Sequence, residues 1–156
     1  DARSFCHREP RKYGLIVFSL PYPYSLNAAS LFTREFFQKM ADRLQPDGAM
    51  AVFLGSPVQK HRLDPIAGGF LRALRQTFPN IIGVSSFECQ NTVVYVSHQP
   101  SLTQARMRST LLALGHSRFR IYSAQQLDNM IGYYGASNLW DFRFCARLNL
   151  GLWGGR

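Results

Sequence analysis

The residues of this chain that could do chemistry are few and widely spaced. Ser56 lies in Gly55-Ser56-Pro57, which lacks the glycine–x–serine–x–glycine elbow that exposes a nucleophilic serine. Cys89 has no histidine close to it in the sequence. His61 and Asp64 are close together, but they fall in an expected loop without a defined third partner. These patterns predict no hydrolytic triad.

The cysteines and histidines do not form a metal-binding pattern. No Cys-x-x-Cys pair occurs, and the number of cysteines is odd, so the sequence predicts neither a zinc site nor a redox pair. Free, mostly buried thiols are expected instead, which fits a reducing, cytoplasmic setting. The residues concerned are Cys6, Cys89, Cys145, His7, His61, His98 and His116.

Two short apolar runs and a helix between them are predicted to position the most informative loop. The run 15–18 is typical of a strand that is covered on both faces, as in a parallel sheet. Pro21 and Pro23 then impose an extended loop. Ser30 or Thr33 can cap a helix whose apolar stripe contains Phe36, Phe37, Met40, Ala41 and Leu44.

A turn and a second strand follow this helix. Pro46-Asp47-Gly48 has turn composition, and the apolar run 49–54 predicts the strand. Strand, helix and strand in this order, with a crossover of this length, imply a right-handed parallel unit.

The rest of the chain extends the same alternation. A helical stripe over 70–78 precedes a strand at 81–84, which a strand at 92–96 can join in an antiparallel hairpin. A helix around 111–114 is expected to end at Gly115, and Ser123 to Gln126 has capping-box spacing. The aromatic, glycine-rich tail from residue 132 onward has no assigned structure, and its aromatics are expected to pack rather than to stack on bases.

Several segments, in the right order, resemble the spermidine synthase-like family of polyamine aminopropyltransferases. The loop after the first strand falls where the family has Asp-x-x-Asp-Pro, and the densest likeness spans residues 13–57. The matching segments are Asp1-Ala2, Tyr13 to Pro23, Leu31-Phe-Thr-Arg-Glu-Phe-Phe37, Gln45-Pro-Asp-Gly48, Gly55-Ser-Pro57 and Arg120 to Leu127.

The resemblance implies an α/β class, S-adenosylmethionine-dependent methyltransferase-like (Rossmann-like) fold. The chain is expected to be the C-terminal portion of that domain, with a mostly parallel sheet and a terminal antiparallel strand. Residues 1–100 would be the C-terminal half of the Rossmann-like domain, and residues 101–156 a helical, aromatic-rich extension of it. Asp1 and Ala2 would contact the adenine of S-adenosylmethionine or its decarboxylated form, whose main binding half lies outside this chain.

The same resemblance places the family's catalytic carboxylates at Ser19 and Tyr22. A serine hydroxyl has no pKa near neutrality and cannot serve as a base for the attacking amine. A family glutamine corresponds to Phe53. The resemblance therefore implies an aminopropyltransferase-like scaffold of polyamine biosynthesis that is expected to be catalytically degenerate, and it leaves open whether the chain is an enzyme.

Two alternatives remain at this point. One is a methyltransferase-like enzyme with a changed acceptor, in which Tyr22, Tyr24 and Phe53 line an apolar substrate pocket. The other is a non-enzymatic basic binding module, because the net charge is +9, from 18 Lys and Arg against 9 Asp and Glu.

The expected partners follow from the charge and from the resemblance. They are the missing N-terminal half of the same domain, a second copy of the chain and an acidic partner. The arginines are scattered and form no long basic run, which argues against nucleic acid. The expected location is the cytoplasm, and it includes the cytoplasmic side of a larger membrane protein.

Overall fold

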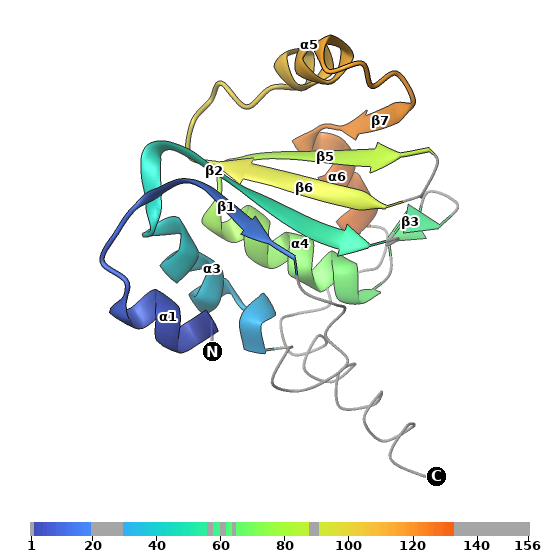
Figure 1. The fold of residues 1–156 in the computed structure, drawn as a ribbon. Coiled ribbons are helices and arrows are strands. Elements are labelled where there is room, and N and C mark those ends of the chain that lie inside the picture. Colours follow the sequence, from blue (N-terminus) through green and yellow to red (C-terminus); the bar gives the residue numbers. More distant parts are fainter. Residues whose placement is uncertain are drawn as a thin grey trace, which may run out of the picture.

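The computed structural model describes residues 2–19, 30–55, 58–59, 62–63, 65–87 and 91–132 (Figure 1). In chain order its elements are α1 (Ala2–Arg8), β1 (Tyr13–Phe18), the 3-10 helix η1 (Ser30–Phe32), α3 (Arg34–Ala41), β2 (Leu44–Gly55), β3 (Val58–Gln59), β4 (Arg62–Leu63), α4 (Pro65–Thr77), β5 (Asn80–Ser86), β6 (Thr92–Ser97), α5 (Gln104–Ala113), β7 (Phe119–Tyr122) and α6 (Ala124–Gly132). The expected α/β class is confirmed.

The main sheet has five strands in the order β1-β2-β6-β5-β7. Strands β1 and β2 pair in parallel, as the strand–helix–strand pattern predicts. β6 pairs antiparallel with both β2 and β5, and β7 pairs antiparallel with β5. The expectation of a mostly parallel sheet is wrong for the pairings, because β6 is inserted between two strands that run in the same direction.

Helices cover one face of this sheet. α3, α4 and α6 lie against it in Figure 1, whereas α5 lies beyond β7. The buried core between sheet and helices includes Met50, Val52, Val94 and Val96 from the strands. On the other face the described residues leave β1 open, with Leu15 60% and Val17 67% exposed. The predicted cover on both faces of β1 is therefore absent from the described part of the chain.

The residue types of the segment 31–37, which lies in the range of densest family resemblance, serve helix capping and core packing. Thr33 caps α3 by accepting a hydrogen bond from the Phe36 backbone N–H at 3.3 Å, and Glu35 lies in the first turn, where a carboxylate favours the helix dipole. Phe36 and Phe37 are buried. Phe37 lies with its ring centroid 5.9 Å from that of Phe18 and 5.2 Å from that of Phe70. Residue types here are explained by capping and aromatic packing.

The predicted turn at Pro46-Asp47-Gly48 lies inside β2 as an irregularity of its pairing with β1. Tyr13 aligns with Leu44 and Leu15 with Ala49, so four residues of β2 oppose one of β1. Gly48 is required here, because a Cβ would stand 2.9 Å from the Tyr13 carbonyl oxygen. α3 accordingly ends at Ala41, and Leu44 is a buried strand residue.

The later elements match their local signals. Gly115 has φ 81° after α5, in the left-handed region that suits glycine at a helix end. The Gln126 N–H donates to Ser123 Oγ at 3.1 Å, and the Ser123 N–H donates to Gln126 Oε1 at 2.8 Å, which confirms the capping box. Strand β7, which no sequence signal predicts, adds Ile121 and Tyr122 to the buried set.

Candidate functional site

An apolar groove of about 380 Å³ runs along β1, on the side away from β2. It lies among α1, β1 and α3, and it reaches the carboxyl end of β1 at Ser19. Its lining residues are Phe5, Cys6, Tyr13, Leu15, Ile16, Val17, Phe18, Ser19, Phe36, Met40 and Arg43. In doubly wound folds ligands bind at this end of the strands, which makes the groove the candidate site.

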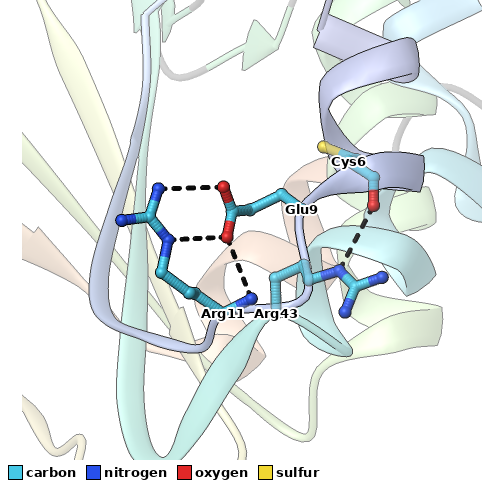
Figure 2. A network of polar contacts seen from close by, with 4 residues as sticks. All are labelled: Cys6, Glu9, Arg11 and Arg43. Atoms are coloured by element: carbon cyan, nitrogen blue, oxygen red, sulfur yellow. Dashed lines mark hydrogen bonds and ion pairs between the residues drawn. The ribbon is translucent and has the colours of Figure 1, made fainter.

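Contacts between α1 and the α3–β2 connection form one wall of the groove. The Cys6 thiol donates to the Met40 Sδ at 3.2 Å. Figure 2 shows the second contact, in which Arg43 Nε donates to the Cys6 carbonyl oxygen at 3.2 Å. The Tyr13 N–H donates to the Arg43 carbonyl oxygen at 2.8 Å. Burial raises the pKa of the Cys6 thiol, although the Arg43 charge opposes that shift. Cys6 is therefore a protonated packing residue.

An ion pair closes the turn between α1 and β1. Arg11 Nε donates to Glu9 Oε1 at 2.7 Å and Arg11 Nη2 to Glu9 Oε2 at 2.9 Å, a two-pronged arrangement drawn in Figure 2. The Arg11 backbone N–H donates to the same carboxylate at 3.0 Å. These side-chain hydrogen bonds lower the pKa of Glu9 to about 2. The turn thus positions the start of β1 beside the groove.

Replacing Glu9 by glutamine is expected to lower the melting temperature at pH 7. The pKa of Glu9 is lower in the folded state than its ordinary value of 4.5. Its contribution to stability is therefore present above pH 4.5 and is lost as the pH falls toward 2. Thermal melts of both proteins across this range should converge at the acid end.

A double-mutant cycle assigns the effect to the pair. Glu9→Gln and Arg11→Gln together should cost less than the sum of the two single changes. A melting difference that is constant from pH 7 to pH 2.5 would show that the carboxylate charge is not the cause.

The structure brings together two of the predicted site residues. Phe18, the last residue of β1, aligns with Val52 of β2, and the next residues along the chain are Ser19 after β1 and Phe53 within β2. Both are exposed, and Phe53 is 36% exposed on the face that the helices leave open. Ala2 is the first residue of α1. The other predicted site residues, Asp1, Tyr22 and Tyr24, lie outside the described residues.

The chemistry of the groove is apolar with one cation. Among its described lining residues Arg43 carries the charge and none is a carboxylate. The described part of the chain also holds no group of three His, Cys, Asp or Glu residues that could bind a metal ion. Such a lining suits a planar or aliphatic group and does not suit a polyamine, which needs negative charge.

Sequence reasoning did not find the wall that α1 builds. Cys6 and Met40 are 34 residues apart, and no local pattern links them. α1 has 7 residues, and the sequence analysis assigned no helix to them. The resemblance drew attention to Asp1 and Ala2 just before this wall, but not to Phe5, Cys6 or Arg43.

The sequence matches no protein-family model and no curated protein, whereas the structure resembles solved ones. A probable spermidine synthase from Corynebacterium glutamicum superposes with a TM-score of 0.61 at 16% identity, over 88% of this chain and 51% of that one. Human methyltransferase-like protein 13, solved in complex with SAH, superposes with a TM-score of 0.50 at 19% identity, over 90% of this chain and 60% of that one.

These similarities establish the fold. The chain has an α/β fold of the class I S-adenosylmethionine-dependent methyltransferase-like kind. It spans about half the length of the spermidine synthase structure and three fifths of the methyltransferase-like one. In the part of the chain that the structure describes, no helix is long and apolar enough to cross a membrane.

Proposed function

We propose that this chain is the acceptor-side part of an S-adenosyl-dependent transferase domain of spermidine synthase-like ancestry, and that it has lost aminopropyl transfer. The observation that carries the proposal is the groove at the carboxyl end of β1. Ser19 stands there where the resemblance implies a catalytic aspartate, and no described lining residue is a carboxylate. Proteins that share a fold can have many different activities. The activity of this chain has therefore to be inferred from the chemistry of the site.

The groove fits only part of an adenosyl cofactor. Its Phe, Tyr and Met side chains can pack against the flat adenine ring, and Arg43 would disfavour a sulfonium cation placed close to it. No described lining residue offers a carboxylate for the ribose hydroxyls. We therefore propose that a further polypeptide half covers the open edge of β1 and supplies most of the cofactor site.

Calorimetric titration of the complete domain tests this function. S-adenosylmethionine or decarboxylated S-adenosylmethionine is expected to bind, while putrescine is neither bound nor aminopropylated. Productive transfer to putrescine would refute the loss of activity. Failure of both cofactors to bind would refute the transferase assignment.

Returning two carboxylates to the loop is expected to restore amine binding. In Ser19→Asp/Tyr22→Asp the new charges attract a diamine, and the affinity for putrescine should rise about tenfold or more at low salt. Ser19→Asn/Tyr22→Asn is the matched control, because it changes size and polarity alike without adding charge. Equal binding by both variants in calorimetry would contradict the electrostatic explanation.

A changed acceptor is the second candidate. Phe53 is exposed beside Ser19, so an apolar or aromatic acceptor could be recognised where a polyamine is not. Tyr22 and Tyr24 would belong to the same pocket. Under this alternative, the cofactor is consumed only when an apolar acceptor is present. Phe53→Ala should raise the KM for that acceptor without changing cofactor binding.

A further inference from the structure

The outer edge of β1 is bordered by no other strand in the described part of the chain. β1 comes first in the order of the sheet and pairs with β2 on its inner side. On this edge strand Leu15 is 60% and Val17 67% exposed, and the groove lies beside them. An apolar edge of this kind accepts a further strand, because backbone hydrogen bonds and apolar burial then favour the same contact.

A segment of the sequence has the pattern of such a strand. In residues 140–152, which lie outside the described part of the chain, every second residue is apolar. Strict alternation predicts a β-strand with one apolar and one polar face, whereas on an α-helix the same apolar residues would be spread around most of the axis. The apolar positions are Trp140, Phe142, Phe144, Ala146, Leu148, Leu150 and Leu152. The positions between them are Asp141, Arg143, Cys145, Arg147, Asn149 and Gly151.

β1 suits such a strand better than β7, the strand at the other end of the sheet. β7 has four residues, and α5 lies beyond it in Figure 1. β1 has six residues, and the groove extends its apolar surface over α1 and α3 through Phe5, Phe36 and Met40. The apolar face of an added strand would therefore be buried against these side chains.

The distance from α6 to β1 decides which copy of the chain supplies the strand. α6, the last described element, packs against α4, α4 packs against α3, and α3 packs against α1. Three helix spacings, about 24–30 Å, therefore separate α6 from the helix beside the groove. Residues 133–139 lead from α6 to the segment and reach at most about 25 Å when fully extended. This length leaves no slack for a path around the helices within one copy, whereas a second copy has no such restriction.

We propose that two copies of the chain exchange strands, so that residues 140–152 of one copy pair with β1 of the other and lay their apolar face on its groove. The inference does not depend on the proposed transferase ancestry. It specifies the contact by which chains with an open β1 edge associate. A further polypeptide half that covered β1 would compete with the exchanged strand for the same edge.

Two full-length variants, each lacking one half of the contact, test the exchange. Leu15→Lys/Val17→Lys places charges on β1, as natural edge strands do to prevent pairing. Phe142→Ser/Phe144→Ser removes two rings from the apolar face of the segment. Analytical ultracentrifugation should show that each variant alone associates at least about a hundredfold more weakly than the wild-type chain. An equimolar mixture should form a 1:1 complex, because one copy then supplies an intact β1 and the other an intact segment.

The matched control changes the other face of the same segment. Arg143→Ser/Arg147→Ser replaces two residues that alternate with the apolar ones and should change the association less than about threefold. A loss as large as that of Phe142→Ser/Phe144→Ser would overturn the role of the apolar face. A mixture of the two defective variants that stays monomeric would overturn the exchange, and so would wild-type association of either variant alone.

Hydrogen exchange of the wild-type chain provides a test that needs no variant to fold. Raising the concentration from one at which the chain is monomeric should slow exchange about tenfold or more in β1 and in residues 140–152 alike, and it should leave β7 unchanged. Slowing in β1 alone would indicate that β1 pairs with β1, and slowing in the segment alone would indicate that the two segments pair with each other. Either result, or a chain that stays monomeric, would overturn the proposal.

Discussion

Replacing Phe37 by alanine is expected to lower the free energy of unfolding by about 3–5 kcal/mol. Phe37 is 0% exposed and lies among the rings of Phe18, Phe36 and Phe70. Removing its ring loses the transfer free energy of a large apolar group, and it leaves a cavity between α3, β1 and α4. Since domains are stable by about 5–15 kcal/mol, a large part of the stability should disappear.

Chemical denaturation followed by circular dichroism measures this change. Phe5→Ala is the control, because Phe5 is exposed at the groove and should cost less than about 1 kcal/mol. A loss at Phe37 as small as that at Phe5 would mean that the aromatic cluster does not form the core. The difference in unfolding free energy between the two variants also tests whether the family-resembling segment 31–37 is needed for packing.

Self-association through β1 is the second large effect that we expect. The described residues place β1 at the end of the sheet, with Leu15 and Val17 exposed and the groove beside them. A free strand edge with an apolar face favours pairing with another chain. The 156-residue chain by itself is therefore expected to associate at micromolar concentration, as analytical ultracentrifugation would show.

Leu15→Lys/Val17→Lys should weaken that association a hundredfold or more. Each aliphatic side chain contributes about 1.5–3 kcal/mol when it is buried, and lysine removes this gain and adds repulsion. The control is Leu112→Lys/Leu114→Lys, whose leucines are 53% and 68% exposed, close to the values for Leu15 and Val17. Leu112 lies in α5 and Leu114 directly follows this helix. If this control disperses the chain equally well, the contact lies at α5 and not at β1.

The groove bears on the activity of the chain, whereas the family-resembling segment 31–37 bears on its fold. Thr33, Phe36 and Phe37 have residue types that capping and packing require, so they speak for the fold. Ser19, by contrast, is an exposed residue directly after β1, and the proposed loss of aminopropyl transfer rests on the hydroxyl that it carries in place of a carboxylate. A scaffold can therefore persist after its chemistry has changed, which is the basis of the proposed loss of aminopropyl transfer.

Local signals in the sequence determined the elements from β1 to β2 and several later ones, but not α1 or β7. The apolar runs that became β1 and β2, the Thr33 cap, the capping box at Ser123 and the glycine after α5 each act within a few residues. Propensity, capping and turn chemistry are short-range effects, so they can be inferred without knowing where the rest of the chain lies. The parallel β1–β2 pair follows from them because the crossover permits little else.

Only the tertiary structure decided how distant segments meet. The insertion of β6 between β2 and β5 depends on backbone pairing and burial across the whole sheet. The Cys6–Met40 contact joins residues 34 positions apart, and the Arg120–Phe87 contact crosses from β7 to the end of β5. Such contacts arise when nonlocal apolar burial fixes the strand order. The groove beside β1 could not be predicted from the sequence for that reason.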